Sequence, residues 1–298
     1  MSPKRIFITG ATGFLGKYLV PLLISSGYHV VALTRKKSRT KIFDTKFNKK
    51  ITWCTSEREV VREFKLGIEC VVHIATSYGR DHETFADVIE TNLLLPIRIL
   101  EKAIAHGCEG FINADTFFHQ DLGLKPKEKS YITTKKFFLE IAKSMISGAS
   151  IKFVNMRIEQ MYGPGDHIEK FIPWLIQKLY SGVPLIELTK GEQKRDFVYV
   201  EDAAEAFVSA VQHIDSFENF EEFGVGTGES VSIKEAVLFL QKATKNTSKL
   251  EWGHIPYRDH EIMESKADIS HNQKLKWVAE TDWREGLQKT VDSTTMSI

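Results

Sequence analysis

The first half of the chain alternates between short apolar runs and longer segments in which apolar residues recur at helical spacing. The runs predict strands at 6–9, 29–34, 70–75, 110–114 and 152–157, and the longer segments predict helices at 14–25, 86–106 and 131–147. Near-continuous apolar strands, such as VVHIA at 71–75, are typical of a parallel sheet that is buried on both faces. This order of elements predicts an α/β fold built on a doubly wound parallel sheet.

Two prolines lie inside predicted helices, Pro21 within 14–25 and Pro96 within 86–106. Each proline removes a backbone hydrogen-bond donor. Because the apolar periodicity continues past both prolines, we expect kinks in these helices rather than breaks.

The pattern is less regular after about residue 165, where loop signals and one further predicted strand at 196–200 interrupt it. From about 221 the sequence indicates helices and short strands suited to a smaller domain that covers a cleft. We therefore predict a first domain over 1–165, to which 195–220 returns. A smaller α/β domain is expected from 166–194 and 221–298.

Composition narrows the possible partners. The 298 residues are 42% hydrophobic, which is enough for a full core, and 40 Lys and Arg balance 39 Asp and Glu. This balance gives no broad attraction to nucleic acid or to a membrane surface, and favours a small-molecule partner. Cys54, Cys70 and Cys108 form no CxxC pair, which indicates core residues, a reducing compartment and no metal site. No apolar run approaches a membrane span and no signal-peptide pattern follows MSPKR, so we expect a cytoplasmic protein.

The segment IFITGATGFLG, residues 6–16, joins the first predicted strand to the first predicted helix through three glycines, Gly10, Gly13 and Gly16. Glycine permits a tight turn and a close approach of the backbone to a pyrophosphate, and the helix N-terminus presents unpaired N–H groups to that anion. Between a strand and a helix, this pattern predicts a dinucleotide site in a Rossmann-type domain.

The end of the second strand distinguishes the two nicotinamide dinucleotides. A carboxylate at this position accepts hydrogen bonds from the ribose 2′-OH of NAD, but residues 32–38 read ALTRKKS and contain none. Arg35 can form a bidentate pair with a 2′-phosphate, and Lys36 or Lys37 adds positive charge. The alternative is a solvated basic loop. We predict NADP(H).

Tyr131 and Lys135 are four residues apart at the start of a predicted helix, so that they share one face. A free tyrosine has a pKa of about 10, and a nearby positive charge favours its phenolate. The pair alone is weak evidence, because YxxxK is common by chance. It follows a strand and loop at 110–116 whose Thr116 hydroxyl is expected at the carboxyl edge of the sheet.

With these features in place, the chain resembles the extended short-chain dehydrogenase/reductase family of nucleotide-sugar epimerases, dehydratases and reductases over nearly its full length. The motifs that carry the resemblance are TGATGFLG at 9–16, VVHIAT at 71–76, TN at 91–92, YITTK at 131–135, NMRIEQMYGPGD at 155–166 and RDFVYVEDAAEA at 195–206. The resemblance implies a homodimer, formed through the segments 86–106 and 131–147.

The resemblance also implies roles by position. Tyr131 is expected to donate or accept the proton, Lys135 to hold the nicotinamide ribose, and Thr116, or alternatively Asp115, to bind the reacting oxygen. The implied cofactor contacts are Gly10, Thr12, Gly13, Phe14, Leu15, Arg35, Lys36, Ala75, Asn92, Tyr131, Lys135 and Arg157. The implied contacts with a nucleotide-diphosphate sugar are Thr76, Asp115, Phe117, Phe118, Arg195 and Arg258.

Several of these residues have plainer alternatives. Arg195 could instead form a salt bridge to Asp196 or Asp202, Arg258 could be an ordinary surface residue, and Phe117 and Phe118 could belong to the core. Three histidines complete the candidates: His73 is expected in the core, and His119 and His167 lie in loops near the predicted cleft.

Departures from the family pattern favour one reaction. Dehydratases of the family carry an Asp-Glu pair directly after the active-site Thr, whereas Phe117 and Phe118, which cannot transfer protons, follow Thr116 here. Arg35 favours a dissociable NADPH over the tightly held NAD of a 4-epimerase. The segment FINADTFF is similar to the CDP-abequose synthase type of reductase, which implies reduction of the 4-keto group of a CDP-3,6-dideoxyhexulose in O-antigen and lipopolysaccharide biosynthesis. The alternatives are an NAD-dependent 4-epimerase and a non-catalytic NADP(H)-binding sensor.

Overall fold

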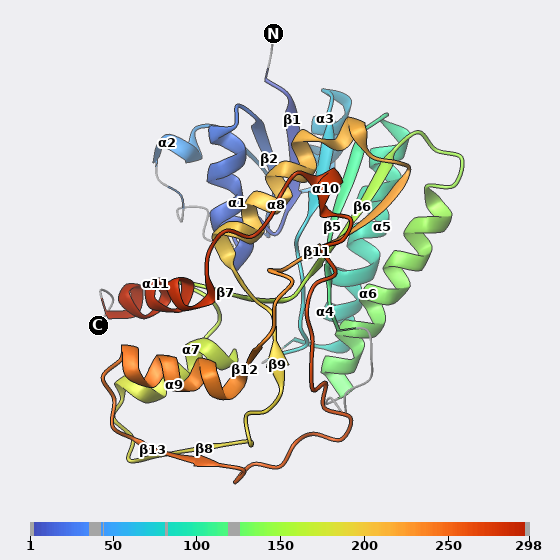
Figure 1. The fold of residues 1–298 in the computed structure, drawn as a ribbon. Helices are drawn as coiled ribbons and strands as arrows, with labels where there is room; N and C mark the ends of the chain where they lie inside the picture. Colours follow the sequence, from blue (N-terminus) through green and yellow to red (C-terminus); the bar gives the residue numbers. More distant parts are fainter. Residues whose placement is uncertain (1–2, 36–42, 44, 81–82, 119–125, 296–298) are drawn as a thin grey trace.

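The computed structural model describes residues 3–35, 43, 45–80, 83–118 and 126–295 (Figure 1). Seven parallel strands form its central sheet in the order β11-β6-β5-β4-β1-β2-β3. These strands are β1 (Arg5–Thr9), β2 (His29–Leu33), β3 (Ile51–Cys54), β4 (Cys70–His73), β5 (Gly110–Thr116), β6 (Lys152–Ile158) and β11 (Phe220–Val225). The predicted doubly wound parallel sheet is confirmed.

Helices cover both faces of this sheet (Figure 1). On one face α1 (Phe14–Ser25) and α8 (Val200–Gln212) pack over residues such as Ile8, Val72 and Val154. On the other face α3 (Glu57–Lys65), α5 (Leu95–Ala105) and α6 (Pro126–Met145) pack over Phe7, Phe111 and Phe153. Burial of large apolar side chains on both faces accounts for strands that are nearly continuous apolar runs. Within the described part of the chain, every helix is too short or too polar to cross a membrane.

The two predicted helices that contain proline differ in structure. α1 runs without interruption through Pro21. The segment predicted as one helix at 86–106 consists of α4 (Phe85–Ile89), a π-helical turn η2 (Glu90–Leu94) and α5. A proline ring clashes with the carbonyl four residues earlier, and the wider π turn directly before Pro96 relieves that clash.

The pattern did not indicate the segment between β2 and β4, which contains α2 (Thr45–Asn48), β3 and α3. β3 is only four residues long, and two of its side chains are half-buried. α3 begins with a capping box in which Ser56 accepts a hydrogen bond from the Glu59 amide and the Glu59 carboxylate accepts one from the Ser56 amide.

The smaller layer (Figure 1) contains an apolar core of its own residues. It is built from α7 (Phe171–Tyr180), α9 (Ile233–Ala243), α11 (Trp283–Thr295) and the parallel pair β8 (Leu185–Leu188) and β13 (Lys249–Trp252). Short strand pairs join this layer to the sheet: β7 (Gln160–Tyr162) with β10 (Phe197–Tyr199), and β9 (Lys194–Arg195) with β12 (Val231–Ser232). The predicted boundary at 221 cuts β11, which pairs with β6 and places Phe223 and Val225 in the core of the main sheet.

The remaining short helices are the 3-10 turn η3 (Ile214–Ser216) and α10 (Asn272–Leu275). α10 brings Leu275 from the C-terminal segment back to the core beneath α8. The last third of the chain therefore contributes to both layers.

Candidate active site

The turn between β1 and α1 is shaped by close backbone contacts. Gly10 has a φ of +79°, and a Cβ on it would lie 2.6 Å from the backbone nitrogen of Ala75. A Cβ on Gly16 would lie 2.4 Å from the carbonyl oxygens of Gly10 and Ala11. Gly13 is the N-cap of α1, no side chain caps this end, and the first turn contains no acidic residue. The N-terminus of α1 is therefore free to bind an anion, and the bare turn fits a pyrophosphate.

The neighbouring predicted cofactor contacts differ in exposure. Thr12 and Phe14 are half-buried at the turn, whereas the Leu15 side chain is packed in the core. Ala75 and Thr76 are half-buried just beyond the carboxyl end of β4. The Ala75 amide donates a 3.3 Å hydrogen bond to the Thr9 hydroxyl, which joins the ends of β1 and β4.

Asn92 lies in the π turn and holds two segments near the site together. Its Oδ1 accepts a hydrogen bond from the Ser77 amide at 2.9 Å, and its Nδ2 donates to the Ser77 carbonyl at 2.7 Å and to the Thr134 hydroxyl at 3.3 Å. The predicted cofactor contact is thus a buried side chain that fixes the loop after β4 against α6.

The expected NADP-recognition segment is described only in part. Arg35 lies two residues after the end of β2 and is exposed. Hydrogen bonds from Thr84 lower the pKa of Asp87, and the positive charge of Arg35 adds a smaller effect in the same direction. Lys36 lies outside the described residues.

Thr116, Tyr131 and Lys135 converge where β5 ends and α6 begins. Burial, followed by the nearby Tyr78, raises the pKa of Tyr131 well above 10, and the Thr116 side chain, which lies close to the phenol, opposes that rise. Lys135 is 3% exposed and donates a 2.5 Å hydrogen bond to the Ala114 carbonyl. Burial lowers the pKa of Lys135 to about 8, while the nearby Asp115 opposes that shift.

The two phenylalanines after Thr116 are half-buried, with ring centroids 4.0 Å apart. The Phe118 amide donates a 3.2 Å hydrogen bond to the Thr116 hydroxyl oxygen. Asp115 is oriented differently: it is buried and accepts a 2.9 Å hydrogen bond from Asn155 Nδ2 on β6. Of the two residues proposed for the reacting oxygen, Thr116 is the one whose side chain acts to lower the pKa of the Tyr131 phenol.

Sequence reasoning missed two residues beside the phenol. The Tyr78 ring lies 5.0 Å from the Tyr131 ring, and the Arg80 guanidinium carbon lies 4.8 Å from the centre of the Tyr78 ring. The carboxylate of Glu83 accepts hydrogen bonds from the amides of Gly79 and Arg80, which fixes this loop. In the sequence, the only indication that Tyr78 and Arg80 belong to the site was that their loop directly follows an apolar strand.

Arg195 is nearly buried and ion-paired, but with a residue that the sequence did not suggest. Its guanidinium lies 2.6 Å from the carboxylate of Glu261 and donates hydrogen bonds to two carbonyls. The alternative partners were wrong, because Asp196 accepts hydrogen bonds from the Thr227 and Gly228 region and Asp202 accepts them from Thr281.

Two more residues lie near Arg195. Arg258 is exposed. Burial lowers the pKa of Arg195, and the positive charge of Arg258 makes a smaller contribution in the same direction. Glu159, which sequence reasoning missed, is buried next to β6 and accepts a 2.7 Å hydrogen bond from Ser265. Burial raises the pKa of Glu159 to about 7. The region therefore combines guanidinium groups with a carboxyl group that titrates near neutral pH.

Arg157 on β6 donates a 3.1 Å hydrogen bond to Glu222 on β11. His73 is fully buried with Nδ1 2.8 Å from the Thr9 hydroxyl, and burial lowers its pKa well below 6.5, so it is a core residue as expected. His167 is exposed in the loop before α7, and His119 lies outside the described residues.

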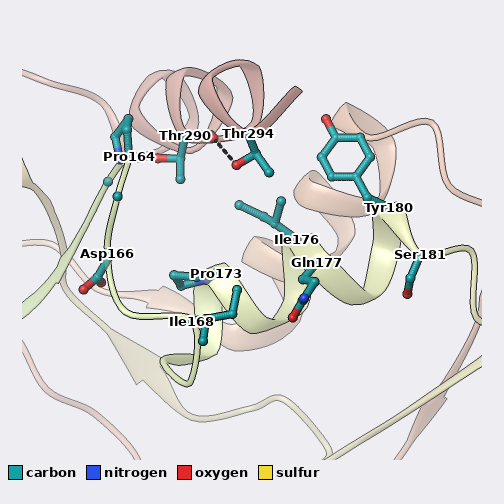
Figure 2. A pocket seen from close by; sticks show the side chains of 12 residues that line it. Pro164, Asp166, Ile168, Pro173, Ile176, Gln177, Tyr180, Ser181, Thr290 and Thr294 are labelled. Carbon is teal, nitrogen blue, oxygen red and sulfur yellow. Dashed lines mark hydrogen bonds between the residues drawn. The ribbon is translucent and has the colours of Figure 1, made fainter. Parts of the chain in front are cut away.

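Two other features lie apart from these residues. A cavity of about 430 Å³ lies between the 163–168 loop, α7 and α11, and none of the predicted site residues that the structure describes lines it. Figure 2 shows the residues around this cavity. Among the described residues, Glu187, Glu251 and His254 are close enough to hold a metal ion, but the cluster lies at the surface and His254 pairs with both carboxylates.

Comparisons with known proteins agree with this geometry. The sequence model of the NAD dependent epimerase/dehydratase family matches residues 6–226. A CDP-abequose synthase of Salmonella muenchen is 34% identical over 288 residues, covering 96% of this chain and 96% of the relative. A CDP-abequose synthase of Salmonella typhimurium is 32% identical over 292 residues, covering 96% of this chain and 97% of the relative.

Among solved structures, MoeE5 in complex with UDP-glucose and NAD superimposes with a TM-score of 0.81 at 25% identity, covering 98% of this chain and 99% of that one. The resemblance drawn from the sequence motifs is therefore confirmed, both for the family and for its similarity to CDP-abequose synthases.

Proposed function

The chain belongs to the NAD dependent epimerase/dehydratase family, and on this basis we propose that it reduces the 4-keto group of a nucleotide-activated 6-deoxy or 3,6-dideoxyhexulose with NADPH. The observation that carries the proposal is the convergence of Thr116, Tyr131 and Lys135 beside the bare glycine turn. Similarity to CDP-abequose synthases over 96% of the chain supports the substrate class.

The residues at the first domain's carboxyl edge fit a nicotinamide dinucleotide. Its pyrophosphate would lie against Gly10 and Gly13 at the uncapped N-terminus of α1, and Lys135 would hold the nicotinamide ribose. NADPH, when bound, supplies the hydride for the reduction. Arg35 supports the choice of NADPH, because a guanidinium pairs with a 2′-phosphate by two parallel hydrogen bonds.

Tyr131 has the protonation state that a reduction needs. Because burial raises its pKa well above 10, the phenol is protonated at neutral pH and can donate to the oxygen on C4 as an alkoxide forms. The Thr116 hydroxyl, which lies close to the Tyr131 phenol, would hydrogen-bond the same oxygen and stabilise its developing charge. Phe117 and Phe118 offer no proton for elimination of water, so dehydration does not fit this site.

The nucleotide diphosphate would bind near Arg195 and Arg258. Glu261 neutralises Arg195 in this structure, and a diphosphate would compete with that carboxylate for the guanidinium. The product would be a deoxy-sugar nucleotide of the kind used in surface polysaccharides.

An NAD-dependent 4-epimerase is the second candidate. It is favoured by the match to MoeE5, whose solved structure contains UDP-glucose and NAD. A 4-epimerase returns the same hydride to its substrate, so it would retain NAD tightly and would convert a non-keto nucleotide sugar without added NADPH.

The first test is the oxidation of NADPH and of NADH with CDP-4-keto-3,6-dideoxyglucose, followed by absorbance. A 4-keto-6-deoxy sugar on another nucleotide is the control for the base and the 3-position. We expect rapid oxidation of NADPH, slower oxidation of NADH, and loss of activity in Tyr131→Phe. Release of tightly bound NAD on denaturation, with no oxidation of NADPH by any keto sugar, would instead identify the epimerase.

A further inference from the structure

A row of polar side chains crosses the central sheet just below the proposed site. Thr9, His73, Asn113, Asn155 and Glu222 occupy equivalent register positions on β1, β4, β5, β6 and β11. Two residues earlier the same face is apolar, with Phe7, Val71, Phe111, Phe153 and Phe220 in the same register. The boundary between these two rows lies under α6, because Phe138 of that helix contacts His73 in the polar row and Phe111 and Phe153 in the apolar row.

The position of α6 sets Lys135 over the polar row. The Phe138 ring packs against the apolar row, with its centroid 6.1 Å from that of Phe111 and 6.0 Å from that of Phe153, and 6.1 Å from the His73 ring. Lys135 precedes Phe138 by three residues and therefore lies on the same face of the helix. Its ammonium donates to the carbonyl of Ala114, the residue before Asp115.

The polar row fixes Asp115 rigidly. Asn155 Oδ1 accepts a 2.8 Å hydrogen bond from Asn113, and Asn155 Nδ2 donates at 2.9 Å both to Asp115 and to Glu222. Both N–H bonds of this amide thus point at carboxylates, which defines its orientation. Asn155 is 0% exposed and Asp115 is 6% exposed. The side chain of Asn155 on β6 therefore holds Asp115 inside the protein, away from solvent.

Among the described residues, His73 on β4 and Asp115 on β5 are the titratable groups coupled to Lys135 from elements packed against α6, and Tyr131 lies one turn earlier on α6 itself. His73 on β4 is neutral, because burial lowers its pKa well below 6.5. Tyr131 on α6 is also neutral at physiological pH. Asp115 on β5 is the negatively charged group that acts on the lysine. Removing an ammonium from water without a nearby opposite charge is costly.

We infer that Asp115 is a positioning residue for the reaction: it is a buried carboxylate, held by Asn155 and next in the chain to the carbonyl that binds the Lys135 ammonium, so that the ammonium stays charged although it is almost fully buried. This assignment replaces the role in substrate binding expected for Asp115. It rests on the proposed function only in that Lys135 is taken as the residue that holds the cofactor ribose.

The direct test is the titration of Lys135 itself, by NMR on protein with 13C- and 15N-labelled lysine. The Lys135 signal is assigned by its loss in Lys135→Met. We expect the midpoint of the Lys135 titration near pH 8 in the wild type. In Asp115→Asn this midpoint should be lower by about one pH unit or more. Glu222→Gln is the matched control. It also removes a carboxylate that is bonded to Asn155, but this carboxylate does not act on Lys135. In this variant the midpoint of the Lys135 titration should stay at the wild-type value.

The pH profile of NADPH turnover gives the second readout. If Lys135 must be charged, activity falls as pH rises through its pKa, and this limb should move to lower pH in Asp115→Asn by the same amount. An unchanged lysine midpoint in a folded Asp115→Asn would overturn the inference. A shifted Lys135 midpoint in Asp115→Asn, together with no turnover of any keto sugar by the wild type, would support the inference and reject the proposed function.

A double-mutant cycle covers the case in which Asp115→Asn alone is too unstable to titrate. Lys135→Met leaves Asp115 as a buried carboxylate without its opposite charge, so Lys135→Met/Asp115→Asn should unfold at a higher temperature than Lys135→Met. If the double variant unfolds at a lower temperature than Lys135→Met, the two side chains are not coupled and the inference is wrong.

Discussion

Gly10 and Gly27 share a left-handed backbone conformation, with φ of +79° and +91°, but differ in their surroundings. A Cβ on Gly10 would meet the backbone of Ala75, whereas nothing lies within 4 Å of a Cβ built on Gly27. Both substitutions to alanine carry the strain of a positive φ, about 1–3 kcal/mol. Only Gly10→Ala also forces the ends of β1 and β4 apart.

We therefore predict that Gly10→Ala lowers the affinity for NADPH at least tenfold, while Gly27→Ala destabilises the fold without changing that affinity. Cofactor binding is measured by the fluorescence of bound NADPH, and stability by thermal unfolding. Equal loss of affinity in the two variants would mean that backbone strain alone, and not the closed turn, accounts for the effect.

Glu159 should make stability depend on pH in a direction opposite to that of most carboxylates. Its pKa is raised by burial to about 7, above the unfolded value of about 4.3. A raised pKa means that the folded state binds the extra proton, so the stability it contributes is present below the unfolded value and is lost as pH rises through about 7.

Relative to the wild type, Glu159→Gln should therefore gain stability between pH 5 and pH 8, by at most about 3 kcal/mol. The measurement is the free energy of unfolding in urea for both proteins at the two pH values. Taking the difference between the proteins cancels all other titrating groups. A difference that is the same at pH 5 and pH 8 would contradict a raised pKa at Glu159.

At the scale of elements, local pattern predicted those parts that local chemistry determines. The glycine turn, the largely apolar strands and the placement of Tyr131 and Lys135 on one helix, α6, all depend on neighbouring residues. β3 and β11 were missed because each is an edge strand, with half-buried positions that weaken the apolar signal. The π turn at Glu90–Leu94 could not be distinguished from a kink, since both relieve the clash of Pro96.

Contacts between distant residues were beyond local reasoning. Arg195 pairs with Glu261, 66 positions later, and not with the nearby aspartates. Tyr78 reaches Tyr131 through a loop whose course depends on Asn92 and Glu83. Asp115 and Thr116 are adjacent in sequence, but only the folded structure shows that Asp115 accepts a hydrogen bond from Asn155 on the neighbouring strand. The candidate site was therefore predicted as a set of residues, and their partners came from the fold.

At the scale of the whole molecule, an apolar surface spans the helices next to the site. Phe85 and Ile89 on α4, Leu94 in the π turn, and Phe137 and Ile141 on α6 are all exposed, and α4 and α6 lie against one another (Figure 1). Clustered exposed apolar side chains mark interaction surfaces. Together with the family resemblance, this surface supports the proposal of a homodimer through these two helices.

The prediction is that the wild type sediments as a dimer and that Phe137→Glu converts it to a monomer, because a second copy would bury the new carboxylate without a partner. Phe137 is 57% exposed, so the monomer itself should tolerate the change and retain its unfolding temperature. Val278→Glu is the matched control, since Val278 is 64% exposed but lies outside the α4 and α6 surface, and it should remain dimeric. Because α6 carries Tyr131 and Lys135 on its buried side, a monomeric variant also tests whether the site needs the partner: unchanged kcat in the monomer would mean that each copy is complete by itself.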